Sequence, residues 1–95
     1  MREADFQRAV TEAAGYLGWV CVHFPAMQMN PSGWPDLICF KEGRTEIMEL
    51  KTERGKLGPR QEEWLERLRD AGMSVNVFRP ADWERIEALL KGEVP

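Results

Sequence analysis

Three side chains with acid–base character stand in two short motifs of this 95-residue chain. Residues 33–37 (GWPDL) open one apolar run with Asp36, and residues 49–51 (ELK) close the next with Glu49 and Lys51. Two carboxylates and an ammonium are costly to hold together at one sheet edge unless they bind something. A divalent metal ion and a phosphodiester would together satisfy all three, so the motifs point to metal-assisted phosphodiester chemistry.

The spacing of the two motifs predicts that their side chains meet. Residues 37–40 and 45–51 have the composition of buried strands, and the sequence KEGR between them places a glycine where a tight turn needs one. A two-residue or a four-residue loop gives partner numbers that add up to 85, which sets Asp36 opposite Glu49 on one face. Lys51 lies two residues further along and shares that face. A three-residue loop would break this register.

The residue types also indicate which ligand would fit. Mg²⁺ or Mn²⁺ prefers carboxylate and carbonyl oxygens, so we expect Asp36, Glu49 and the Leu50 carbonyl to hold the ion. The metal would polarise the scissile phosphate and activate a water molecule, while Lys51 would orient that water or stabilise charge on the phosphate oxygens. Each motif also has an ordinary alternative, because Pro-Asp is a common turn and the three charges could form a salt-bridged cluster.

Other polar residues are further candidates for the same site. Glu3 begins the first predicted helix, with Gln7 one turn later on the same face, but an acidic residue there also suits the helix dipole. Gln61 stands near the start of a later helix, where backbone N–H groups can take a phosphate, or it is an ordinary exposed residue. His23 ends a predicted strand and is either a partly buried histidine or part of the site.

Charge is unevenly distributed along the chain. The net charge of −3 argues against non-specific binding of nucleic acid by the whole surface. Residues 41–60 nevertheless hold six basic and four acidic residues, which is compatible with DNA contact at one face or with an ordinary mixed surface. The nearby motif favours phosphate contact by the three basic side chains that follow it, Arg54, Lys56 and Arg60.

Length and composition indicate one globular domain over residues 1–95, with 43% apolar and 31% charged residues. No apolar run approaches the roughly 20 residues of a membrane span, and the N-terminus has no signal-peptide character. We therefore expect a cytoplasmic protein with no membrane contact. Cys21 and Cys39 stand in predicted strands and are expected to be buried apolar residues rather than a disulfide or a metal site.

The apolar pattern predicts the element order α-β-β-β-α-β-α. We expect helices over residues 3–17, from 59 to a stop at 72 and from 80 to about 92, and strands over residues 19–24, 37–40, 45–51 and 74–78. Four strands with helices before and after them suggest an α/β fold whose mixed sheet is covered on both faces. Trp19, Trp64 and Trp83 are expected in the core, whereas Trp34 beside the first motif is a candidate for substrate contact.

In combination these motifs resemble the VRR-NUC domain family of the PD-(D/E)XK nuclease superfamily. The resemblance runs from Glu3 to about Asp82 and includes residues 3–7 (EADFQ), 18–19 (GW), 23–25 (HFP), 33–37 (GWPDL), 49–52 (ELKT), 55–57 (GKL), 61 (Q), 64–65 (WL) and 71–72 (AG). It implies an αβββαβ core with a four-stranded mixed sheet flanked by helices, here followed by an extra C-terminal helix. The residues that match the family's active site by position are Glu3, Asp36, Glu49, Lys51 and Gln61.

The resemblance further implies a metal-dependent DNA endonuclease of the stand-alone phage or bacterial type, in the cytoplasm of a bacterium or a phage-infected host. The resemblance also implies a homodimer that cuts branched DNA, notably four-way Holliday junctions. Two symmetric cuts need two active sites, which a two-fold dimer supplies. Two interfaces fit the sequence: the apolar positions of the first helix and the loop over residues 25–33.

Two alternatives stay open at this point. The same chemistry could serve a flap, nicking or restriction-like nuclease with a different substrate geometry. The acidic pI and short loops also fit a non-catalytic module that binds DNA or protein, in which Asp36, Glu49 and Lys51 form only a salt-bridged cluster. Loss of Lys51 separates these hypotheses, because it should abolish cleavage and spare DNA affinity in a nuclease but lower fold stability in the module.

Overall fold

The computed structural model describes residues 1–25 and 31–93, and its element order agrees with the predicted order. The elements are α1 (Glu3–Tyr16), β1 (Val20–His23), β2 (Leu37–Lys41), β3 (Arg44–Leu50), α2 (Pro59–Asp70), β4 (Ser74–Phe78), the 3₁₀ turn η1 (Pro80–Asp82) and α3 (Trp83–Lys91). Among the described residues, no helix is long and apolar enough to cross a membrane.

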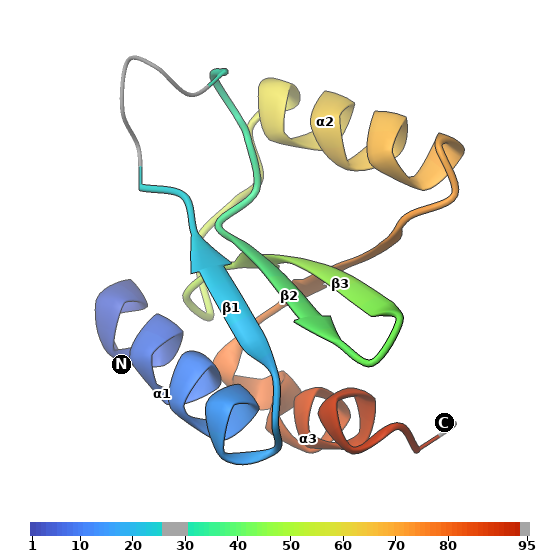
Figure 1. The fold of residues 1–95 in the computed structure, drawn as a ribbon. Helices are drawn as coiled ribbons and strands as arrows, with labels where there is room; N and C mark the ends of the chain where they lie inside the picture. Colours follow the sequence, from blue (N-terminus) through green and yellow to red (C-terminus); the bar gives the residue numbers. More distant parts are fainter. Residues whose placement is uncertain (26–30, 94–95) are drawn as a thin grey trace.

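The four strands form one mixed sheet in the order β1-β2-β3-β4. β1 pairs with β2 and β2 with β3 in antiparallel orientation, whereas β3 and β4 are parallel. A parallel pair needs a crossover connection, and α2 supplies it across one face of the sheet. Figure 1 shows α1 and α3 side by side on the other face, so the predicted mixed sheet with helices on both faces is confirmed.

A two-residue turn sets the register between β2 and β3. Glu42 (φ 45°) and Gly43 (φ 80°) both adopt the left-handed conformation that a type I′ hairpin turn requires. The turn pairs Lys41 with Arg44, and the ladder continues with partner numbers that add up to 85 as far as Leu37. The predicted register is therefore confirmed over the whole of β2.

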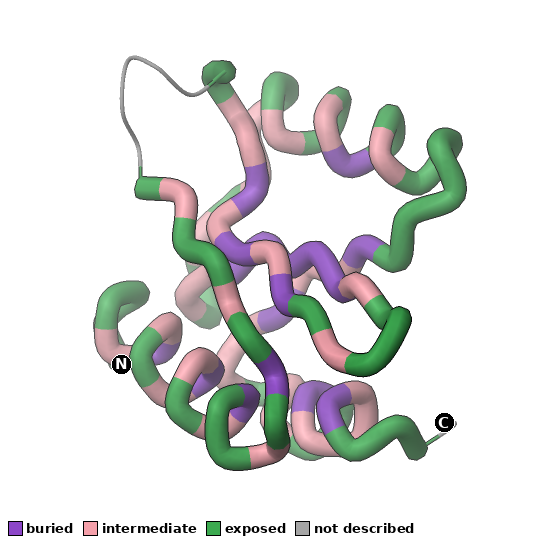
Figure 2. Tube along the Cα trace, in the orientation of Figure 1, coloured by how far each residue is buried: buried purple, intermediate pink, exposed green. Residues whose placement is uncertain are grey.

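Two apolar clusters pack on the two faces of the sheet. The larger lies between the sheet and the α1–α3 layer and includes Phe6, Leu50 and Ile86. The smaller lies beneath α2 and includes Ile47 and Leu65. Because successive strand residues point to opposite faces, β3 contributes to both clusters and is buried over most of its length (Figure 2).

The apolar face of α1 is used inside the protein itself. Phe6, Val10 and Ala14 are all buried beneath the sheet. The apolar positions of the first helix, one of the two candidate interfaces, are therefore already occupied by packing against the sheet. The other predicted interface, the loop over residues 25–33, falls largely on residues 26–30, which lie outside the described residues.

β1 and the last α-helix both begin later than predicted. Trp19 is buried before β1 begins, and its Nε1–H donates to the Leu90 carbonyl at 2.9 Å, which confirms its place in the core. The last α-helix begins at Trp83 because Asp82 Oδ2 accepts a hydrogen bond from the Arg79 N–H at 2.8 Å and holds the preceding residues in a 3₁₀ turn.

The two cysteines lie directly opposite each other on β1 and β2. Both are free thiols, and Cys39 is fully buried while Cys21 is half-buried. Cys39 is therefore buried as expected, whereas Cys21 is only partly so.

Candidate active site

Asp36 and Glu49 stand at neighbouring strand ends, as the register predicts. Asp36 directly precedes β2, and the β2–β3 pairing extended by one residue sets it opposite Glu49. The Leu50 N–H donates to Asp36 Oδ2 at 2.8 Å, which ties the carboxylate to the end of β3. The Phe24 N–H donates to the Asp36 carbonyl at 2.8 Å, which ties its backbone to the chain beyond β1. The structure thus brings the two predicted carboxylates together.

Burial dominates the electrostatics of Glu49, which is only 2% exposed. Loss of water raises the pKa of Glu49 to about 9, and both its hydrogen bond with Asp36 and the charge of Asp36 act in the same direction. The charge of Lys51 lowers this pKa and the charge of Glu3 raises it, each by a smaller amount. This raised pKa favours the protonated form of Glu49 beside Asp36 when no cation is bound.

One oxygen of Glu49 lacks a partner. Its Oε2 is buried and has no hydrogen bond with any described residue. A buried polar atom without a partner is costly, and a bound cation would remove that cost. With Asp36 beside it and the Leu50 carbonyl next along the chain, the donor set consists of oxygens, which suits Mg²⁺ or Mn²⁺.

The protein contributes few ligands to such an ion. The described part of the chain contains no group of three or more His, Cys, Asp or Glu side chains placed to hold a metal. Two carboxylates, a backbone carbonyl and water are nevertheless a common set for Mg²⁺, which keeps several of its own water ligands. The residues present therefore fit a hydrated hard cation better than a fully enclosed metal such as structural zinc.

The predicted strand over residues 45–51 included Lys51, but β3 ends at Leu50 and Lys51 directly follows it. Its N–H donates to the Phe78 carbonyl at 3.0 Å, so its backbone is fixed to the end of β4. Its aliphatic stem passes close to Gly55, where an added Cβ would stand 3.6 Å from Lys51 Cδ. Among the described residues no ion pair includes Lys51, Asp36 or Glu49, so the salt-bridged-cluster alternative finds no support there.

The two candidates on helices have different surroundings. Glu3 begins α1, is exposed, and lies close enough for its charge to raise the pKa of Glu49. Gln61 lies in the first turn of α2, where its Oε1 accepts a hydrogen bond from the Gly58 N–H at 2.8 Å and caps the helix. Gln61 therefore has a structural role at the start of α2, whichever ligand the site takes.

Gln7 is a polar residue that sequence reasoning did not select for the site. It lies one turn after Glu3 on α1, and its Nε2 is buried without a hydrogen-bond partner among the described residues. The spacing of four residues from Glu3 was the only signal for it, because that spacing places both side chains on one helix face. Gln7 adds an unused donor to that face of α1.

The three predicted DNA-binding side chains project from the segment that follows the site. Arg54, Lys56 and Arg60 are exposed, and none of them forms an ion pair with another described residue. The loop beneath them is anchored, because Arg79 Nη1 donates to the Thr52 carbonyl at 2.5 Å. Arg54 and Lys56 on this anchored loop, with Arg60 in the first turn of α2, are well suited to contacts with phosphate groups.

Trp64 and Trp34 pack against each other near the Pro-Asp segment. Trp64 was expected in the core but is half-buried, and its ring meets Trp34 edge-to-face at 5.0 Å between centroids. Trp34 is also half-buried in this contact. His23 is exposed at the end of β1 opposite Leu37, at the edge of the sheet.

Gly33 brings the loop before Asp36 against the first turn of α2. Its φ of 85° lies in the left-handed region. A Cβ added there would stand 2.5 Å from the Arg60 carbonyl carbon and 2.7 Å from the Gln61 nitrogen, which no side chain allows. The glycine of the GWPDL motif is thus required by a close approach of two backbones.

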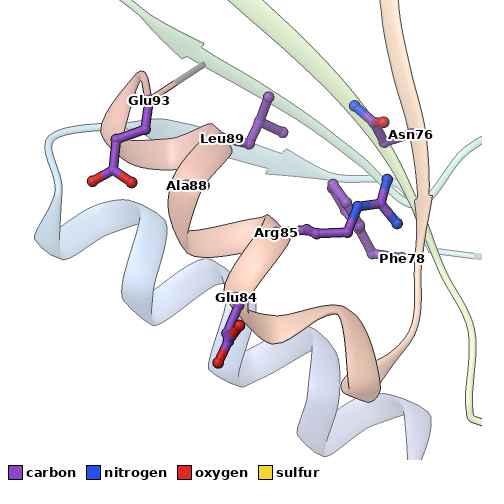
Figure 3. Close-up of a pocket in the computed structure, with 7 residues that line it drawn as sticks. All are labelled: Asn76, Phe78, Glu84, Arg85, Ala88, Leu89 and Glu93. Atoms are coloured by element: carbon purple, nitrogen blue, oxygen red, sulfur yellow. The ribbon is translucent and has the colours of Figure 1, made fainter. Parts of the chain in front are cut away.

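A separate hollow of about 250 Å³ lies between β4 and α3 (Figure 3). The Arg85 side chain reaches over the Phe78 ring, with its guanidinium carbon 5.6 Å from the ring centroid. Phe78 faces the α1–α3 layer, whereas its neighbour Val77, which pairs with Glu49, packs in the cluster beneath α2. The hollow therefore lies on the opposite face of the sheet from the carboxylates.

The VRR-NUC domain family matches residues 11–82. The chain belongs to this family. A solved VRR-NUC domain has 26% sequence identity to it and a TM-score of 0.77 over 94% of each chain.

A second solved structure has a similar fold. The Holliday junction resolvase Hjc of the archaeal hyperthermophile Archaeoglobus fulgidus is similar over 80% of this chain and 67% of its own, with a TM-score of 0.58 and 18% identity. At that identity the likeness is one of fold alone. No curated protein sequence matches the chain.

The match confirms the resemblance drawn from the motifs. This VRR-NUC domain has the αβββαβ core of the PD-(D/E)XK nucleases, followed by α3. Asp36, Glu49, Lys51 and Gln61 lie within the matched region, and Glu3 precedes it.

The Gly33→Ala change should destabilise this VRR-NUC domain beyond the cost of a left-handed backbone alone. We expect the free energy of unfolding in urea to fall by about 2–4 kcal/mol, because the new Cβ would force the loop away from α2. Gly72→Ala is the matched control, with φ of 87° and nothing within 4 Å of the added Cβ. That change should cost only the left-handed backbone penalty of about 1–2 kcal/mol. Equal losses at the two positions would contradict the close approach.

Proposed function

We propose that this protein is a metal-dependent, structure-selective DNA endonuclease that resolves four-way Holliday junctions as a homodimer. The observation that carries the proposal is the buried Asp36–Glu49 pair, with one unpartnered carboxylate oxygen and Lys51 next to it. Membership of a nuclease family supports the reaction class. The fold shared with an archaeal Holliday junction resolvase supports the choice of substrate.

In this proposal Asp36, Glu49 and the Leu50 carbonyl hold one Mg²⁺ or Mn²⁺ ion. Such an ion, when bound, polarises the scissile phosphate and lowers the pKa of a water molecule that becomes the nucleophile. Asp36 is already oriented by the Leu50 N–H, and Glu49 gives up its proton when it becomes a ligand. Lys51 directs its ammonium toward the phosphate oxygens and stabilises the charge that develops there.

Arg54, Lys56 and Arg60 are proposed to position the DNA backbone beside these groups. Contacts with phosphate fix orientation but carry no sequence information. Binding through a few local cations also agrees with the net charge of −3, which disfavours coating of the protein by DNA. An enzyme built in this way selects its substrate by the shape of the DNA.

The uncovered face of β1 and β2 supports the homodimer. Val20 (66% exposed), Val22 (42%) and Phe40 (44%) are neighbours in the sheet, because Val20 pairs with Phe40 and Val22 with Ile38. β1 is mostly exposed (Figure 2), and α2 packs over the β4 side of the sheet. An exposed apolar patch on an edge strand is a liability unless a partner covers it.

A second copy of the chain fits this apolar patch. The patch of Val20, Val22, Ile38 and Phe40 carries no charge, so it is complementary to itself across a two-fold axis and unsuited to DNA. Ile38 stands two residues from Asp36 on the same strand face. A two-fold axis through the patch would therefore set both carboxylate pairs on a shared side, as two cuts in one junction require.

The Val20→Glu change should convert the dimer into a monomer of 11.0 kDa in sedimentation velocity. Two glutamates that face each other across the axis would lose water and repel, which costs several kcal/mol. Tyr16→Glu is the matched control, because Tyr16 is 92% exposed outside the patch, and this variant should remain dimeric. A monomeric wild type at micromolar concentration, or a dimeric Val20→Glu protein, would contradict the proposed interface.

Cleavage of labelled DNA tests the proposed activity. A four-way junction, a flap, a duplex and a single strand are each incubated with Mg²⁺, Mn²⁺ or EDTA. We expect paired symmetric cuts in the junction that EDTA abolishes and that Lys51→Ala reduces by about 100-fold or more, with DNA affinity kept. Lys91→Ala removes an exposed lysine at the end of α3 and should cleave normally.

The possible outcomes distinguish the remaining alternatives. Cuts confined to the flap or the duplex would keep the nuclease and replace its substrate with a flap, nicking or restriction-like one. Cleavage that survives in Lys51→Ala would refute the role given to the ammonium. Failure to cut any DNA in the presence of bound metal would leave the non-catalytic binding module.

A further inference from the structure

An aromatic row links the Pro-Asp segment to α2. The centroid of the Trp34 ring lies 5.9 Å from that of Phe24 and 5.0 Å from that of Trp64, and both contacts are edge-to-face with interplanar angles of 81° and 78°. The guanidinium carbon of Arg67 lies 5.3 Å from the Trp64 centroid and extends the row along α2. Three segments that are distant in sequence therefore meet at Trp34.

Trp34 is connected to Asp36 through a single buried proline. The ring of Pro35 fixes its own φ, so a movement of Trp34 is transmitted along a stiff link. At the other end of the row, the Phe24 N–H donates to the Asp36 carbonyl at 2.8 Å. The row thus holds the backbone of Asp36 from two directions, while the Leu50 N–H holds its carboxylate.

Trp64 is the residue that α2 contributes to this row. It is half-buried, and neither apolar cluster of the described residues includes it. The neighbouring Leu65, 2% exposed, instead packs α2 against the sheet. The ring of Trp64 therefore anchors Trp34 more than it fills the core, because edge-to-face contact between aromatic rings is favourable beyond the burial of area.

We propose that Trp64 is a positioning residue for divalent-cation binding, which acts through Trp34 to keep Asp36 where it and Glu49 can share one ion. The inference rests on the proposed metal-dependent function. Oxygen ligands must stand within about 2.0–2.6 Å of such an ion, so a small displacement of Asp36 weakens binding. Residues that orient metal ligands from behind typically change metal affinity by about 10- to 100-fold when they are removed.

Calorimetric titration with MnCl₂ tests this role without relying on cleavage. We expect Trp64→Leu to bind Mn²⁺ about 10-fold more weakly than the wild type. Trp64→Phe should restore most of the affinity, because an aromatic ring can still meet Trp34 edge-to-face. Trp83→Leu is the matched control, since Trp83 is a half-buried tryptophan packed against the cluster on the other face of the sheet, and it should bind like the wild type.

Each outcome of the titration decides the question. Wild-type affinity in folded Trp64→Leu, or an equal loss in Trp83→Leu, would overturn the inference and leave the proposed function standing. A wild type that binds no Mn²⁺ would overturn the proposed function, and the inference with it. Should Trp64→Leu fail to fold, Phe24→Leu loosens Trp34 from the opposite side. We expect the same 10-fold loss there, and an unchanged affinity would overturn the inference.

Discussion

The burial of two carboxyl groups at one edge of the sheet is the constraint on which the rest of this VRR-NUC domain depends. Glu49 is almost fully enclosed beside Asp36, and the loss of water raises its pKa to about 9. Burial of two ionised carboxylates side by side is strongly disfavoured, so without a cation the protonated form of Glu49 is favoured. A cation shared by the two carboxylates would compensate their negative charge. The burial of the pair therefore favours the proposed metal-dependent chemistry.

The scaffold fixes this pair from positions that take no part in chemistry. The Glu42–Gly43 turn sets the register that places Asp36 opposite Glu49. Gly33 lets the segment before Asp36 approach the first turn of α2. The aromatic row around Trp34 holds that segment against the helix. Rigid strand ends thus carry the proposed metal-binding groups. Of the exposed cations proposed to meet DNA, Arg54 and Lys56 stand on the neighbouring loop and Arg60 stands in the first turn of α2.

The register could be predicted from sequence because a glycine turn and strand alternation are local properties. The Asp36–Glu49 pair followed from them directly. How helices dock on the sheet depends instead on packing between distant residues, so the burial of the α1 apolar face and the contact of Trp34 with Trp64 were missed. The unpartnered oxygen of Glu49 and the helix cap formed by Gln61 could not be predicted, because the sequence pattern does not give the positions of side-chain atoms.

Thermal unfolding at increasing Mn²⁺ concentration tests the central claim most directly. The Tm of the wild type should rise with Mn²⁺, by an amount equivalent to about 2.7 kcal/mol at 100 times the Kd, and Glu49→Gln should abolish the rise. Glu46→Gln is the matched control, because Glu46 is also buried on β3 but bonds Ser74, and it should keep the rise. A wild-type Tm that does not change with Mn²⁺ concentration, or an equal rise of Tm in Glu49→Gln, would contradict the account.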